Sequence, residues 1–131
     1  MKIGFMGAGA MGGAILSGAM DAGVVKPQDV YVSDFSEAIR TKFREKGCSI
    51  VANNEELAEK ADIVVAAVKP QYAAPALEEL GKKFSGKAMI SIMAGLTIVG
   101  ISTLEQHGVR GAFIDTVARA TERAQELGKA N

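Results

Sequence analysis

The chain has few of the residue types that carry much of protein chemistry. Its 131 residues include one cysteine, one histidine and no tryptophan. A single cysteine, Cys48, excludes an internal disulfide, and we expect it to be buried as a small apolar residue in a protein of the reducing cytoplasm. The histidine, His107, precedes Gly108 and is expected to cap a helix end. The sequence contains no cluster with metal-ligand spacing and no nucleophile beside a base, so we expect no metal site.

Net charge and long apolar runs are also absent. Fifteen basic residues balance fifteen acidic ones, which removes the whole-chain electrostatic case for binding nucleic acid or an anionic membrane. The longest apolar run, residues 63–68, is far too short to cross a bilayer. The first residues have one lysine and a short strand, without a cleavable apolar core, so we expect no secretion signal.

The most informative pattern is an apolar strand that runs into Gly-x-Gly-x-x-Gly at Gly7, Gly9 and Gly12. In a dinucleotide-binding motif the first glycine permits a tight turn, the second lets a pyrophosphate approach the backbone, and the third lets the next helix press on the strand. The free N–H groups of that helix then face the phosphates. A glycine-rich structural turn is the alternative. Because strand, turn and helix follow in the required order, we favour dinucleotide binding.

Strands and helices alternate along residues 1–96, which we expect to form a dinucleotide-binding domain. Apolar runs predict five strands, at residues 3–6, 30–33, 49–51, 63–68 and 88–93. Capping residues predict helices at residues 10–22, 37–46 and 55–60, and another with Pro75 in its first turn that ends near Phe84. In the first helix, Ile15 and Leu16 are expected on the buried face. The pattern predicts an α/β fold with a Rossmann-like, mainly parallel sheet in the order 3-2-1-4-5, and a ligand crevice at the carboxyl ends of strands one and four.

After Gly95 the alternation stops, and residues 97–131 are expected to form a helical segment. Residues 100–106 predict a short helix and residues 111–127 a longer one. The longer helix carries an apolar stripe, made of Phe113, Val117, Ala120, Ala124 and Leu127. A stripe of this width must cover something. It either docks on the sheet or meets its twin from another chain, which would make a homodimer.

Asp34 stands at the end of the second predicted strand, 22 positions after Gly12. A carboxylate in this place can accept both ribose hydroxyl protons of an adenosine, and it would repel a 2′-phosphate, which favours NAD over NADP. Arg40, one helical turn beyond Ser36, could still reach such a phosphate. The alternative interpretation of Asp34 is a turn residue or a helix cap.

Residues after the fourth and fifth strands complete the predicted crevice. Lys69 and Pro70 follow the fourth strand, where the lysine could meet coenzyme phosphates or an acidic substrate. The alternative is a solvated lysine at a strand end. Ala94 and Gly95 follow the fifth strand, and they put small residues where a nicotinamide ring would need close approach to the backbone.

Four stretches together resemble the pyrroline-5-carboxylate reductases, which reduce a cyclic imine acid to proline with NAD(P)H. They are residues 3–15, Asn-Asn-Glu-Glu at 53–56, residues 66–71 with Val-Lys-Pro, and residues 91–98 with Ala-Gly. The Val-Lys-Pro discriminates, since the opening alone also suits the 3-hydroxyacid dehydrogenases. The resemblance implies NAD or NADP as cofactor, with contacts from Ala8, Gly9, Ala10, Met11, Asp34, Asn54, Val68, Lys69 and Ala94.

The sequence departs from the family pattern in three places. Family members often have Asn or Gln where Ala10 stands, and NADP-preferring members commonly have Ser or Asn where Asp34 stands. Typical members also have a long C-terminal helical domain that forms an interlocked dimer and completes the substrate pocket. Residues 97–128 resemble the far end of that domain, which implies an internal deletion near residues 97–100.

Three functions are therefore open. The first is a reductase that converts 1-pyrroline-5-carboxylate to proline, in which the coenzyme supplies the hydride and the protein orients it against the imine. No catalytic side chain is identified for it. The second is an inactive NAD(P)-binding module that has lost its substrate half. The third is a shortened chain that self-associates through its terminal helix.

Overall fold

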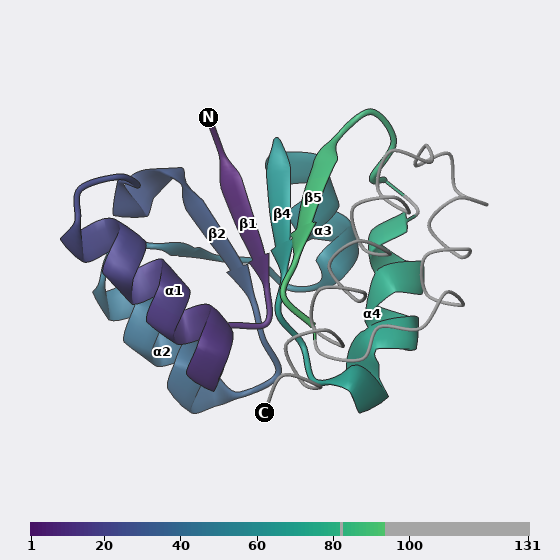
Figure 1. The fold of residues 1–131 in the computed structure, drawn as a ribbon, viewed down its shortest axis with the longest axis horizontal. Coiled ribbons are helices and arrows are strands. Elements are labelled where there is room, and N and C mark those ends of the chain that lie inside the picture. Colours follow the sequence, from purple (N-terminus) through teal and green to yellow (C-terminus); the bar gives the residue numbers. More distant parts are fainter. Residues whose placement is uncertain (82, 94–131) are drawn as a thin grey trace, which may run out of the picture.

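The computed structural model describes residues 1–81 and 83–93, and these form a parallel sheet with helices on both faces (Figure 1). The sheet has the strand order β3-β2-β1-β4-β5, which confirms the predicted α/β fold and topology. Its strands are β1 (Ile3–Met6), β2 (Val30–Ser33), β3 (Ser49–Ile50), β4 (Ile63–Ala66) and β5 (Ala88–Ser91). The helices are α1 (Ala10–Asp21), α2 (Glu37–Glu45), α3 (Asn54–Lys60) and α4 (Pro70–Gly81), with a 3-10 turn η1 (Pro27–Asp29) before β2.

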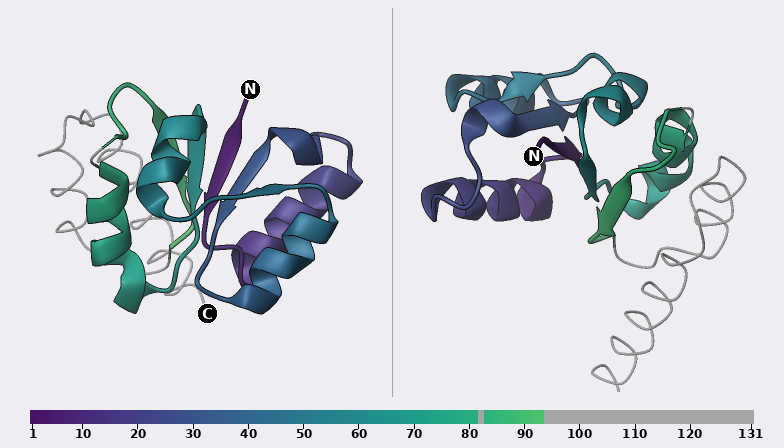
Figure 2. Two further views of the ribbon diagram at one scale, coloured as in Figure 1. Left: turned by 180° about the vertical axis from the view of Figure 1, so that it is seen from behind. Right: turned by 90° about the horizontal axis from the view of Figure 1, so that it is seen from above.

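Different helices cover the two faces of the sheet, as Figure 2 shows from above. On one face Leu16 of α1 and Phe43 of α2 pack with Phe5 of β1. On the other, Leu57 of α3 packs in a cluster that includes Met6 of β1 and residues of α4. Because successive side chains of a strand point to opposite faces, the neighbours Phe5 and Met6 enter different clusters. The central strand is therefore buried on both sides.

Two helices begin at capping side chains, and a glycine turn follows a third. The Ser36 hydroxyl accepts a hydrogen bond from the backbone N–H of Ile39 at 3.4 Å, and the Asn53 side chain accepts one from Glu56 at 2.8 Å. After α1 the chain turns at Gly23 with φ of +69°, a conformation that glycine adopts without a steric penalty. Ser36 and Asn53 therefore mark where two of the loops at the carboxyl edge of the sheet end.

Two helical details correct the sequence-based predictions. Ile15 is 42% exposed, because the small residues Gly12 and Gly13 together with Leu16 make the buried side of α1. Helix α4 begins at Pro70, so Pro75 lies inside the helix and not in its first turn. A proline in the first helical position lacks only an N–H that would have no partner there, which favours the earlier start.

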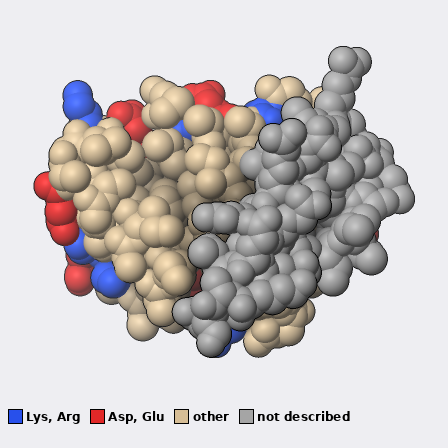
Figure 3. All heavy atoms as spheres, viewed as in Figure 1, with Lys and Arg blue, Asp and Glu red and all other residues tan. Residues whose placement is uncertain are grey.

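Cys48 is buried, as predicted, and lies directly before β3. Burial raises the pKa of its thiol above the ordinary value. Within the described part of the chain, no helix is long and apolar enough to cross a membrane. On the face shown in Figure 3, acidic and basic side chains are interspersed around the edge of the described residues. The predicted C-terminal helices, His107 and the domain boundary at residue 96 lie outside those residues.

Candidate functional site

The turn between β1 and α1 uses each motif glycine in a different way. Gly7 has φ of +86°, and a Cβ there would lie 3.0 Å from the carbonyl group of Ala67. A Cβ on Gly12 would lie 2.7 Å from the Gly7 oxygen, so only glycine lets α1 sit this close to the turn. A Cβ on Gly9 would meet no atom of the described residues within 4 Å. The space over Gly9 is therefore open to a ligand, as the motif predicts.

The first turn of α1 leaves backbone donors available. Gly9 caps the helix without a side-chain hydrogen bond, and its carbonyl accepts the N–H of Gly13 at 2.8 Å. The preceding amides, of Ala10, Met11 and Gly12, have no acceptor among the described residues. Such amides and the helix dipole together favour an anionic group at this end of a helix.

Asp34 contacts the glycine turn directly. Its Oδ2 accepts the backbone N–H of Ala8 at 2.9 Å, and its Oδ1 accepts that of Ser36 at 2.8 Å. The turn-residue interpretation of Asp34 is therefore correct as far as these contacts go, and the Ala8 amide is already occupied by protein. Each carboxylate oxygen has a second acceptor position, so these contacts do not exclude a ribose hydroxyl.

Arg40 lies beside Asp34 at the start of α2. Its Nη1 donates to the Asp34 carbonyl at 3.4 Å, and its guanidinium also forms an ion pair with Glu37. The hydrogen bond and the charge of Arg40 lower the pKa of the exposed Glu37 carboxyl. The Arg40 charge is thus shared with Glu37 while the side chain lines the same cleft as Asp34.

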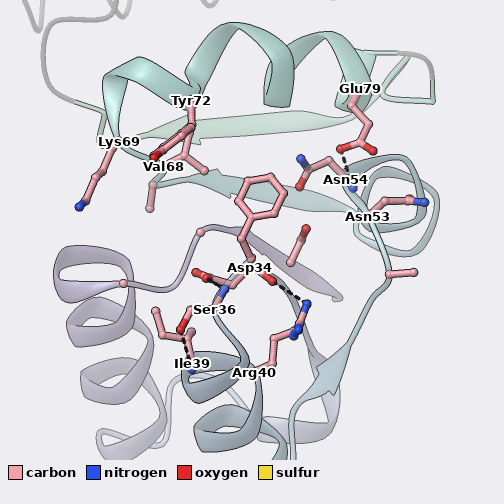
Figure 4. A pocket seen from close by; sticks show the side chains of 16 residues that line it. Asp34, Ser36, Ile39, Arg40, Asn53, Asn54, Val68, Lys69, Tyr72 and Glu79 are labelled. Atoms are coloured by element: carbon pink, nitrogen blue, oxygen red, sulfur yellow. Dashed lines mark hydrogen bonds between the residues drawn. The ribbon is translucent and has the colours of Figure 1, made fainter.

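A cleft of about 570 Å³ opens over these residues, at the carboxyl ends of β1, β2 and β4. In Figure 4, Asp34, Ser36 and Arg40 form one wall, and Asn54, Val68 and Tyr72 lie across from them. The predicted residues that line it are Gly7, Gly9, Asp34, Asn54, Val68 and Lys69. Because β4 ends at Ala66, two residues earlier than its apolar run predicts, Val68 lies in the loop that borders the cleft.

The other predicted site residues lie elsewhere. Ala8 and Ala10 line a second hollow, which Gly9 also borders, and Gly12 is packed beneath the turn. Met11 is exposed, and Pro70 begins α4. Neither of these two borders the main cleft. Ala94 and Gly95 lie outside the described residues.

Sequence reasoning missed three side chains of this cleft. Phe35 and Tyr72 are 81% and 51% exposed, and their rings meet edge to face with centroids 6.5 Å apart. Glu79 of α4 reaches the cleft and accepts the backbone N–H of Asn54 at 3.2 Å. Phe35 and Tyr72 could have been predicted from their positions, because one follows β2 and the other lies at the start of α4, at the carboxyl edge of the sheet. Among the described residues no group of acidic, histidine or cysteine side chains could hold a metal.

Comparisons with known proteins agree with this architecture. The family model described as NADP oxidoreductase, coenzyme F420-dependent, matches residues 2–95. The model for pyrroline-5-carboxylate reductase dimerisation matches residues 73–127. The second match covers most of the segment beyond the sheet and overlaps the first by part of α4 and β5.

The relatives named in curated collections have the same family name. Pyrroline-5-carboxylate reductase of Methanosarcina acetivorans is 38% identical over 86% of this chain and 42% of its own length. Pyrroline-5-carboxylate reductase 2 of Bacillus subtilis is 32% identical over 74% of this chain and 36% of its own. The chain therefore spans about two fifths of the length of these relatives.

Solved structures give the same result for the fold. The Plasmodium falciparum pyrroline carboxylate reductase with NADP bound superposes with a TM-score of 0.68 at 34% identity, covering 79% of this chain and 37% of that one. An imine reductase from Myxococcus stipitatus superposes with a TM-score of 0.71 at 20% identity, over 82% and 38% of the two chains, which shows the fold alone. From the glycine turn, the sheet order and these matches, the chain belongs to the pyrroline-5-carboxylate reductase family.

Proposed function

We propose that the chain binds NAD or NADP in the cleft at the carboxyl ends of β1, β2 and β4. The observation that carries this is the space over Gly9 beside the amides of Ala10 and Met11, which have no acceptor in the described part of the chain. A diphosphate fits there because it needs close backbone approach and N–H donors. The NADP-bound Plasmodium falciparum relative supports the same class of ligand.

In this proposal, residues on the two sides of the glycine turn contact different halves of the dinucleotide. Asp34 and Arg40 face the adenosine half, because they follow β2, next to the glycine turn. Asn54, Val68 and Lys69 face the nicotinamide half, on the β4 side. Asp34 favours NAD, since its carboxylate repels a 2′-phosphate, whereas Arg40 is the cation nearest to where that phosphate would lie. The balance of these two side chains sets the coenzyme preference.

The reaction we propose is the reduction of 1-pyrroline-5-carboxylate to proline, an oxidoreductase step of proline biosynthesis. When bound, the reduced coenzyme would supply a hydride to the C=N carbon of such an imine, while the imine nitrogen takes a proton from water. The chain's own residues orient the nicotinamide ring against the imine and exclude water. Lys69 makes no ion pair with another described residue and is the cation available to the acidic substrate.

A second candidate function is a dinucleotide-binding module without turnover. It is supported by the lining of the cleft, where none of the described residues is identified as a catalytic side chain. In either case we propose that residues 97–131 are what remains of the dimerisation domain after an internal deletion, and that the stripe on residues 113–127 forms a homodimer. The dimerisation match over residues 73–127 supports this assignment, and the single cysteine supports a cytoplasmic location.

Titration of the purified chain with NADH and with NADPH, followed by addition of the imine acid, separates these functions. Saturable quenching or enhancement of coenzyme fluorescence and proline formation above a coenzyme-only blank support the reductase. Saturable binding without proline supports the module. If neither coenzyme gives a saturable signal, both proposals are wrong. Sedimentation at several protein concentrations tests the dimer.

A further inference from the structure

Asn54 combines burial with an unused hydrogen-bonding side chain. It is 5% exposed and is the one buried polar residue of the described part of the chain. No hydrogen bond among the described residues uses its side-chain amide. Every fully enclosed side-chain N or O atom of these residues has a hydrogen-bond partner, so the amide atoms of Asn54 are not fully enclosed. The amide therefore reaches the open space of the cleft, which Asn54 lines. Figure 4 shows it pointing away from α3 toward the opposite wall.

The backbone of Asn54 is held from another helix. Asn54 is the first residue of α3, and Glu79 of α4 accepts its backbone N–H at 3.2 Å, a contact drawn as a dashed line in Figure 4. The N-cap Asn53 satisfies a different amide of the same turn, that of Glu56. Glu79 forms no ion pair among the described residues. Its carboxylate is also favoured by the partial positive charge at a helix start.

We propose that Glu79 is a positioning residue, which fixes the first residue of α3 so that the Asn54 side chain is presented to hydroxyl groups of the bound dinucleotide. A primary amide both donates and accepts, which matches the two roles of a ribose hydroxyl. A side chain that binds from a buried position has little freedom to adjust, so a shift of its backbone is felt at the ligand. The inference rests on the proposed coenzyme binding.

Glu79 also lines the cleft and the neighbouring hollow beside Tyr72, so a direct contact with the ligand is the competing explanation. The two explanations differ in how Glu79 and Asn54 combine. If Glu79 acts through Asn54, removing Glu79 has no effect once the Asn54 amide is gone. If Glu79 touches the ligand itself, the two losses add.

A double-mutant cycle on the full chain distinguishes them, with coenzyme Kd as the readout. We expect E79A and N54A each to weaken binding of the better coenzyme about tenfold, the size of one well-placed hydrogen bond. The double variant should bind no more weakly than N54A. E79Q should restore most of the affinity, because its side-chain oxygen still accepts the Asn54 N–H. E78A, an exposed neighbour on α4, is the matched control and should bind like wild type.

Additive losses in the double variant would overturn the inference, as would wild-type binding by E79A. Where E79A does not fold, as judged by circular dichroism, E79D replaces it. The aspartate keeps the charge but withdraws the carboxylate by one methylene, so wild-type binding by E79D also overturns the inference. Faster hydrogen exchange of the Asn54 amide in E79D is the expected structural signature. If the wild-type chain binds neither coenzyme, the proposed function is wrong. This outcome is distinct from the variant results, which test the role of Glu79.

Discussion

The Asp34 carboxylate anchors the glycine turn, because its Oδ2 accepts the backbone N–H of Ala8 at 2.9 Å. The other oxygen accepts the N–H of Ser36 at 2.8 Å, so a single side chain joins the β1–α1 turn to the beginning of α2. In the proposed function the same carboxylate also receives ribose hydroxyls. Structure and coenzyme choice are therefore coupled at this residue.

We expect D34S to weaken NADH binding about tenfold while leaving NADPH binding equal or tighter. The serine removes the acceptor for the ribose hydroxyls and the charge that repels a 2′-phosphate. It should also lower the free energy of unfolding by about 1 kcal/mol, since the Ala8 amide loses its acceptor. Titration with both coenzymes and urea denaturation measure the two effects. D21S, at an exposed helix end, is the control. An equal loss for NADH and NADPH would contradict the ribose contact and leave only the anchoring role.

We expect G9A to retain its stability and lose coenzyme affinity by tenfold or more, about 1.4 kcal/mol. The added Cβ would meet no atom of residues 1–81 or 83–93 within 4 Å, so the described fold accepts it, while the methyl group occupies space that a diphosphate needs. G18A, inside the adjoining helix α1, also places a Cβ that meets none of the described atoms within 4 Å and serves as the control for a glycine-to-alanine change. Thermal denaturation and coenzyme titration test both variants. Unchanged affinity in G9A would place the diphosphate elsewhere.

We expect K87M to destabilise the fold by about 1–2 kcal/mol. The Lys87 ammonium donates to the carbonyl of Ala58 and to those of Glu59 and Ala61, at 3.1 and 2.9 Å, where α3 ends. These carbonyls carry the negative end of the helix dipole, so a cation there is stabilising. Urea denaturation measures the change. K83M, which breaks an exposed ion pair with Glu59, is the control and should cost less than about 0.5 kcal/mol. Equal effects of the two variants would show that the carbonyl contacts add nothing.

Alkaline pH should destabilise the chain partly through Cys48. Burial raises the pKa of its thiol above the ordinary value of 9.0, so the folded state holds its proton longer than the unfolded state does. Unfolding then releases a proton, and stability falls as pH rises above that ordinary value. C48A should lack this component. Urea denaturation of both proteins at about pH 8 and about pH 10 tests this, because the difference in their stabilities should shrink with rising pH. A constant difference would contradict it.

The parts of the site that depend on local chemistry could be predicted from sequence. Gly7, Gly9 and Gly12 follow from what a turn, a ligand and a packed helix each require, and Asp34 follows from its place after β2. The Ala8–Asp34 contact was not predicted, because it depends on the exact separation of two turns. The contact of Glu79 with the start of α3 could not be predicted either, since nothing local to α4 shows that the side chain reaches Asn54.

The errors on α1 and α4 have similar causes. Helical spacing predicted Ile15 on the buried side, but the close approach that Gly12 permits rotates that side toward the glycines. Proline favours the first turn of a helix, so the sequence predicts Pro75 in the first turn of this helix. Pro70 meets the same preference about one turn earlier, and α4 begins there. Two equally suitable signals in one segment cannot be ranked by local rules.

Backbone hydrogen bonds join the carboxyl ends of the three strands β2, β1 and β4. The Gly7 N–H donates to the Ser33 carbonyl and the Ala67 N–H to the Met6 carbonyl, each at 2.8 Å. The base of the cleft is therefore as stiff as the sheet and cannot widen to admit a bulkier ligand without breaking these bonds. Different coenzymes must therefore be accommodated at the rim of the cleft, where Phe35, Arg40 and Tyr72 lie on separate elements. Evolution of new ligand preferences in this chain would accordingly begin with rim substitutions, over a base that changes little.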